Sequence, residues 1–175
     1  MGIIKHNNFE GLIDNVYQTH CLLQQNAQKA VNRNLTMRNW LVGYYIVEFE
    51  QNGEDRAKYG TRLLEEMAKE IKAKGIKGLN LRTLRNCRIF YSTYPQIRQS
   101  VTAELQESLP TSIRGTLSRE LSEAYPISPE MLLSRLSFTH FVELLRKDDP
   151  LERLFYEVET IKNNWSFVLK PVKNG

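Results

Sequence analysis

Positive charge gathers in one stretch of the 175-residue sequence. Between Ile71 and Ala103 there is no aspartate or glutamate, and the stretch holds seven basic residues, which are Lys72, Lys74, Lys77, Arg82, Arg85, Arg88 and Arg98. The whole chain carries a net charge of +4, so the rest of it sums to −3. This asymmetry indicates a surface that faces a polyanion, although a solvated basic face without a partner would give the same pattern.

The residues from Leu81 to Tyr94 predict a helix whose two sides differ in chemistry. At 100° per residue, one side collects Leu84, Cys87, Tyr91 and Tyr94, and the opposite side collects Arg82, Arg85, Asn86, Ile89 and Thr93. Arginine can bind guanine O6 and N7 through two parallel hydrogen bonds, and asparagine can do the same with adenine. The first half of this helix therefore predicts contacts with DNA base edges through Arg82, Arg85 and Asn86.

A second helix lies just before this one in the sequence. Residues 56–73 have an apolar face, and a break that contains two glycines follows them at residues 74–78. Asn80 is placed to cap the next helix, and Pro95 to end it. Two helices joined in this way predict a helix-turn-helix, in which the second helix enters the major groove of DNA.

The lysines around the break complete the expected surface. Lys72, Lys74 and Lys77 are predicted to contact DNA phosphates, which position a protein without reading sequence. Arg88 belongs to the same basic set, but it lies at the margin between the two sides of its helix. A structural arginine that spans core and surface is the alternative for that residue.

The N-terminal part of the chain predicts a long helix from Phe9 to Asn32. Its apolar positions are Phe9, Ile13, Val16, Leu23, Ala27 and Ala30, and with His20 included they alternate in steps of four and three over three heptads. Such a face could pack on the core of the same chain or pair with a second copy. In the second case Phe9, Ile13, Val16 and Leu23 are the candidate residues of a homodimer interface.

A separate helix is expected from Met37 to Asn52, with Thr36 as its N-cap. It is apolar almost all round, which predicts the central buried element of the domain. Gly43 lies in its middle, where glycine costs about 1 kcal/mol relative to alanine. A close helix crossing at this point would explain the glycine.

The C-terminal half is less regular. Residues 96–130 contain several prolines, serines and threonines, and they predict a loop in which a short helix over 100–108 or a small β wing could lie. Two more helices follow, one capped by Ser137 and running to about residue 147, the other capped by Asp149 and running to about residue 163.

These patterns predict a mainly α, multi-helix domain that contains a helix-turn-helix, with a small β wing as an option. A long helix in residues 1–35 would precede the domain. The domain itself would span residues 36–166, with 96–130 as its variable part. Residues 167–175 are expected to be a frayed end.

Signatures of catalysis are missing from the sequence. Cys21 and Cys87 form no metal-binding pair and are expected to be reduced thiols, so no zinc or other cofactor is predicted. A metal-dependent nuclease needs paired carboxylates and a lysine, and the nearest string, Glu70-Ile71-Lys72, ends a predicted helix. We therefore interpret Glu70 and Lys72 as surface charges.

Membrane and export signals are missing as well. No apolar run approaches the roughly 20 residues that span a bilayer, and the N-terminus lacks the apolar segment of a signal peptide. A cytoplasmic location without membrane contact is expected.

Three strings carry a family resemblance. RNWLVGYYIVEFEQNGEDRAKYG, FYSTYP and ERLFYE followed six residues later by NNWS are similar to the N-terminal domain of the YhcG-like proteins, a bacterial family. The resemblance covers roughly residues 8–166 and is poor over 96–130. It implies a winged helix-turn-helix DNA-binding domain, which in the family precedes a nuclease domain of the PD-(D/E)xK type associated with restriction and mobile DNA. This chain departs from the family pattern after NNWS, which suggests a truncated or stand-alone form.

The function expected from residues and resemblance together is binding of double-stranded DNA without cleavage. The alternative is a module for protein interaction, in which the long first helix joins a nuclease or another subunit of a restriction system. Phosphate contacts would make affinity depend steeply on salt, whereas an apolar assembly surface would not.

Overall fold

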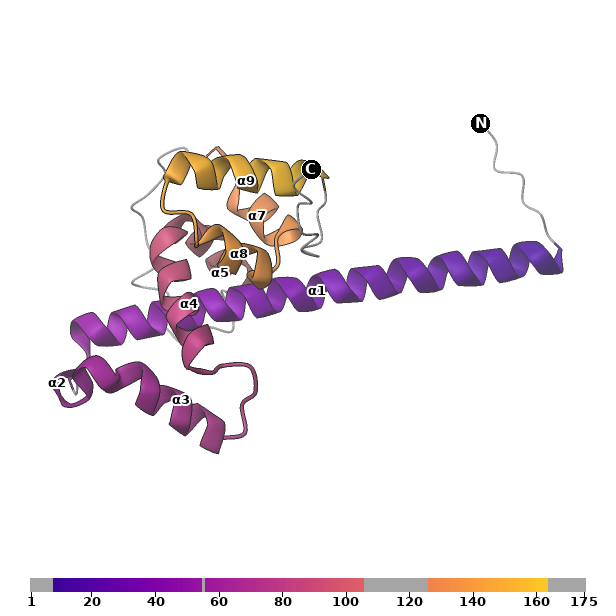
Figure 1. Cartoon of the computed structure of the whole chain (residues 1–175). Coiled ribbons are helices and arrows are strands. Elements are labelled where there is room, and N and C mark those ends of the chain that lie inside the picture. Colours follow the sequence, from indigo (N-terminus) through magenta and orange to yellow (C-terminus); the bar gives the residue numbers. More distant parts are fainter. Residues whose placement is uncertain (1–7, 55, 106–125, 164–175) are drawn as a thin grey trace, which may run out of the picture.

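A computed structural model describes residues 8–54, 56–105 and 126–163. The regular elements in this part of the chain are all helices and none is a strand, so the mainly α expectation is confirmed. Figure 1 shows one long helix that runs through a cluster of shorter ones and projects far beyond it on one side. Most of the segment in which a wing was an option, residues 106–125, lies outside the described residues, as does the expected frayed end at 167–175.

The long helix, α1, runs without a break from Phe9 to Asn52. Its N-cap is Asn8, whose side chain accepts a hydrogen bond from the backbone N–H of Gly11 at 2.9 Å. The predicted break before Met37 is wrong. Thr36 is buried inside the helix, and its hydroxyl donates to the carbonyl of Asn32 at 2.8 Å, which is a bond that helical threonine can make without ending the helix.

Two parts of α1 have different environments. The arm, which we define as residues 9–35, lies outside the cluster of helices. The remaining residues of α1 form the centre of the body, which we define as the described residues from 36 onward. Met37, Trp40 and Tyr44 are buried there, as the apolar pattern predicts. The domain boundary expected at residues 35 and 36 thus falls within one continuous helix.

The segment expected as one helix over residues 56–73 is divided in the structure. It consists of α2 (Arg56–Tyr59), the 3-10 turn η1 (Gly60–Arg62) and α3 (Leu63–Ala73). Gly60 adopts a positive φ of 47°, a conformation that glycine reaches at little cost and that interrupts a right-handed helix. The expectation of one continuous helix is therefore wrong.

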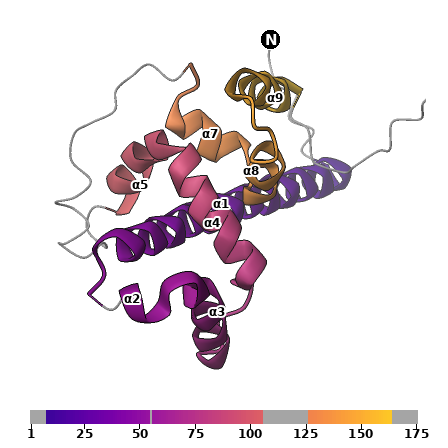
Figure 2. The ribbon, with the colours of Figure 1, turned by 60° about the vertical axis from the view of Figure 1, so that its left-hand side comes forward.

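The helix α4, Leu81–Thr93, agrees with the prediction at both ends. The side chain of Asn80 accepts from the backbone N–H of Thr83 at 3.0 Å, and Pro95 follows the last turn. Figure 2 shows α4 lying across α1. They cross at Gly43, where a Cβ atom would stand 2.0 Å from the carbonyl oxygen of Cys87, so the close crossing expected from the sequence is present.

The C-terminal part packs against one side of α1 and α4 (Figures 1 and 2). It consists of the 3-10 turn η2 (Pro95–Ile97), α5 (Arg98–Leu105), α7 (Pro129–Arg135), α8 (Phe138–Leu144) and α9 (Pro150–Asn163). The ends of the expected loop are therefore helical. The start of α7 uses two local signals, a Ser128 side-chain cap and Pro129 in the first turn. Ser137 caps α8, as expected, and His140 completes the cap by accepting from the backbone N–H of Ser137. Asp149 accepts from the backbone N–H of Leu151 and caps α9.

A buried polar chain joins three of these elements. The indole N–H of Trp40 donates to the carbonyl of Tyr94 at 2.9 Å, and the hydroxyl of Tyr94 donates to the carboxylate of Glu157 at 2.6 Å. All three side chains are fully buried. Burying a carboxylate costs free energy unless it is hydrogen-bonded. These hydrogen bonds therefore fix the position of α9 relative to α4 and α1.

Candidate nucleic-acid interface

The two sides of α4 are those expected from the sequence. Leu84, Cys87 and Tyr94 are buried against the body, together with Phe90, which the angular projection did not include. Arg82, Arg85 and Arg88 are exposed, and Asn86 is partly exposed. The arginines of α4 therefore line the outer side of the helix, and two of them lie in its first half.

The three arginines differ in their ion pairs. Arg88 contacts Glu50 of α1 at 2.9 Å and so connects α4 to the central helix, which fits the structural alternative for this residue. Arg85 lies 3.9 Å from Glu65 of α3, a long contact between two side chains that are both more than half exposed. No ion pair within the described parts of the chain involves Arg82. Arg82 and Arg85 are thus available to a ligand, and Arg88 is engaged.

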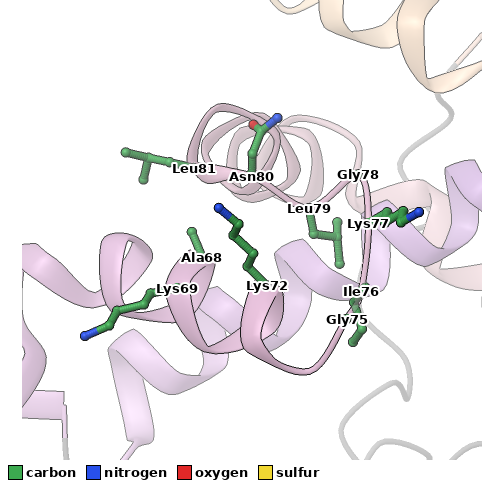
Figure 3. A pocket seen from close by; sticks show the side chains of 10 residues that line it. All are labelled: Ala68, Lys69, Lys72, Gly75, Ile76, Lys77, Gly78, Leu79, Asn80 and Leu81. Carbon is green, nitrogen blue, oxygen red and sulfur yellow. The ribbon is translucent and has the colours of Figure 1, made fainter.

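A basic hollow lies between the end of α3 and the start of α4. It has a volume of about 700 Å³ and is lined by Ala68, Lys69, Lys72, Gly75, Ile76, Lys77, Gly78, Leu79, Asn80 and Leu81. In Figure 3 the amine of Lys72 reaches across it toward Asn80, while Lys69 and Lys77 extend from opposite sides of the rim. The hollow thus opens next to the N-terminus of α4 and carries three ammonium groups.

The structure places the three lysines of the turn differently, and their predicted contact with phosphates stays a prediction. Lys72 and Lys77 line the hollow, whereas Lys74 is exposed at the end of α3 outside its lining. Lys69 was missed, although it lies one turn before Lys72 on the same helix. The connection spans residues 74–80, which is longer than the three to four residues of a tight helix-turn-helix. Gly75 and Gly78, with φ of 78° and 84°, shape it.

The candidate pairing residues lie on the arm. Phe9, Ile13, Val16 and Leu23 are all at least half exposed, and none touches the body core. In this structure the face does not pack on the core of the same chain, which was the other possibility for it.

Other candidate chemistry stays peripheral. Glu70 and Lys72 are exposed near the end of α3, and within the described ranges no three His, Cys, Asp or Glu side chains gather as a metal site would require. None of the helices in the described part of the chain combines the length and the apolar character that crossing a membrane requires.

The two cysteines differ in accessibility, which gives a simple test of the packing. Burial raises the pKa of the Cys87 thiol to about 12, whereas Cys21 is partly exposed on the arm. Since only the thiolate reacts, we expect a maleimide or disulfide reagent at pH 8 to label Cys21 quickly and Cys87 only after unfolding. Mass spectrometry of native and denatured samples measures this. Equal labelling rates in the native protein would contradict the crossing of α1 and α4.

Fold and surface together define a helical domain with a basic surface where α3 meets α4, and comparison with known proteins gives its family. Residues 18–169 match the DUF1016 N-terminal domain. The chain is also 34% identical over 144 residues to the Escherichia coli (strain K12) protein named "Putative nuclease YhcG". No solved structure matches it.

The chain belongs to the DUF1016 N-terminal domain family, and the YhcG-like resemblance is confirmed. The aligned region is 79% of this chain but only 37% of the Escherichia coli protein. The chain therefore corresponds to little more than a third of that relative.

The strings that carry the resemblance meet in the core. Trp40 belongs to RNWLVGYY, Tyr94 to FYSTYP and Glu157 to ERLFYE, and these are the three residues of the buried polar chain. Each of the three strings thus contributes a residue to the core of the domain. These core residues identify no ligand, and the exposed surface is the part of the domain that bears on function.

Proposed function

We propose that this chain is a DNA-binding module that uses α4 and the adjoining hollow. The observation that carries the proposal is that exposed arginines of α4 lie next to a hollow lined by three lysines. Lysines at this position can neutralise phosphates, and the arginines can reach the base edges from the first half of α4. The relative's name, which refers to a nuclease, agrees with a role on nucleic acid.

We further propose that this part of the protein binds DNA and does not cut it. Glu70, the carboxylate nearest to a nuclease-like order in the sequence, lies exposed on a helix and its backbone carbonyl accepts from Lys74. Incubation of supercoiled plasmid with the chain and Mg²⁺ is expected to leave the plasmid intact. Nicking that disappears in Glu70→Ala would overturn this assignment.

Binding is tested by fluorescence anisotropy with a labelled 20-base-pair duplex at several salt concentrations. If about five phosphates are neutralised, the slope of log affinity against log salt is expected to be about −4 to −5. The variant with Lys72→Ala, Lys74→Ala and Lys77→Ala should lose about three units of that slope.

A matched variant separates a local surface from overall charge. Lys58→Ala, Arg135→Ala and Lys162→Ala together remove the same charge from residues outside the lining of the hollow, and this variant is expected to keep the wild-type slope. Equal losses in both triple variants would contradict the proposed surface. Salt-independent affinity, or no binding at low salt, would favour the alternative of an interaction module.

A further inference from the structure

The arm is a long helix that pairs with the body at its base, through Arg33, and whose remainder projects beyond the other described helices. Its side chains include large apolar groups at high exposure, such as Phe9 at 77% and Leu23 at 60%. An isolated helix of this length gains little stability in water without packing, and a run of exposed apolar side chains marks an interaction surface. Contact with another molecule would stabilise the arm as a helix.

The apolar stripe of the arm continues into the body. The four-three steps from Phe9 through Leu23 and Ala30 lead on, by way of Asn34, to Met37, Leu41 and Tyr44. These last three residues are buried in the core of the chain's own body. Where the body begins, Arg33 of the arm forms ion pairs with Glu104 and Glu130. One end of the stripe is therefore covered by the chain itself, and the rest is bare.

We propose that two copies of this chain associate through their arms as an antiparallel pair of helices. A partner helix running parallel would follow the stripe from Phe9 toward Met37 and meet the body that already covers it. An antiparallel partner can end at residue 34, beside the body, with its whole arm on the bare part. The two bodies then lie at opposite ends of roughly 40 Å of paired helix.

The sequence of the stripe favours the antiparallel register in which His20 faces Leu23 of the other copy. In this register Ile13 lies opposite Ala30 and Val16 opposite Ala27, so large side chains meet small ones in both directions. A parallel pair would place alanine against alanine at two levels and fill less space. Interdigitation of large and small groups is what a well-packed helix pair requires.

The charges of the arm favour the same direction. Glu10 and Asp14 lie near its free end, and Lys29 lies near the body, close to the engaged Arg33. Antiparallel pairing brings the acidic end of one arm near the basic end of the other, and it also opposes the two helix dipoles. Parallel pairing would place like charges together at both ends.

Two neighbouring leucines provide a matched test. Leu22 and Leu23 are 58% and 60% exposed, but only Leu23 lies on the stripe. Light scattering after gel filtration is expected to give a dimer for the wild type and for Leu22→Asp, and a monomer for Leu23→Asp. Circular dichroism should show that both variants keep the folded body, because neither residue contacts it. A monomeric wild type at about 100 µM, or two variants that behave alike, would overturn the proposal.

Crosslinking tests the direction independently of DNA binding. In a Cys21→Ser background, Val16→Cys combined with Ala27→Cys should give covalent dimers with a short bismaleimide, because the two positions face each other across an antiparallel pair. Each single cysteine variant should stay uncrosslinked, since equivalent positions then lie about 16 Å apart along the helices. Efficient crosslinking of Val16→Cys alone would contradict the antiparallel arrangement.

Discussion

Replacing Gly43 by alanine is expected to lower the free energy of unfolding by about 3 kcal/mol or more. In an ordinary helix this substitution would stabilise by about 1 kcal/mol, because alanine is the better helix former. Here the added Cβ would stand 2.0 Å from the carbonyl oxygen of Cys87 and 2.8 Å from the Cβ of Tyr91. The clash is with backbone as well as side chain, so α4 has to move away from α1, and the sign of the effect reverses.

Urea denaturation followed by circular dichroism measures the change. Gly11→Ala is the matched control, since Gly11 lies in the same helix but on the arm, outside the body. That variant is expected to be neutral or slightly stabilising. A Gly43→Ala protein as stable as the wild type would mean that α1 and α4 do not cross at this residue.

Local signals in the sequence predicted the parts of the fold that depend on neighbouring residues. The caps at Asn80 and Asp149 and the stop at Pro95 are where they were expected. Each of them needs only a side chain and a backbone group within a few positions of one another. The close contact at Gly43 was also predicted, since a glycine within an apolar helix indicates a close helix crossing. The sequence did not identify α4 as the crossing helix.

Competing local signals explain the errors. Thr36 has the chemistry of a cap, but nothing between Asn32 and Met37 ends a helix, so its hydroxyl bonds within the helix instead. At Gly60 the error was the reverse, and one helix was predicted where there are two. The apolar face continues across this residue, but the glycine interrupts the helix. In both places the pattern of apolar residues was right and the boundary of the helix was wrong.

Buried polar contacts were beyond the reach of sequence patterns. On α9, the apolar side chains of Leu151 and Phe155 are exposed, while the polar side chains of Glu157 and Thr160 are buried. A carboxylate inside the core needs hydrogen-bond donors, and one of them is the Tyr94 hydroxyl, 63 residues away in sequence. No local spacing encodes such a partner. The exposure of the arginines of α4 was predictable because it depends only on spacing within one helix. The residues that α4 buries in the core fix which side of the same helix its arginines occupy.

Arg85→Ala is expected to weaken binding to a preferred DNA site by about 1–3 kcal/mol, or roughly 5- to 150-fold, and to relax sequence preference. The long contact between Arg85 and Glu65 does not oppose this role, because exposed ion pairs contribute little. Lys74→Ala, in contrast, is expected to weaken all sequences alike. Selection of a preferred duplex from a randomised library, followed by anisotropy with that duplex and a scrambled one, measures both effects.

Arg88→Ala is the control within the same helix. Its guanidinium contacts Glu50 at 2.9 Å, so its loss is expected to reduce stability modestly and to leave DNA affinity nearly unchanged. The comparison separates a helix that reads bases from a helix that is merely basic. If Arg85→Ala, Arg88→Ala and Lys74→Ala weakened both duplexes equally, α4 would contribute charge alone. If Arg85→Ala reduced the preference and Arg88→Ala did not, the exposed first half of α4 would be the part that distinguishes one DNA sequence from another.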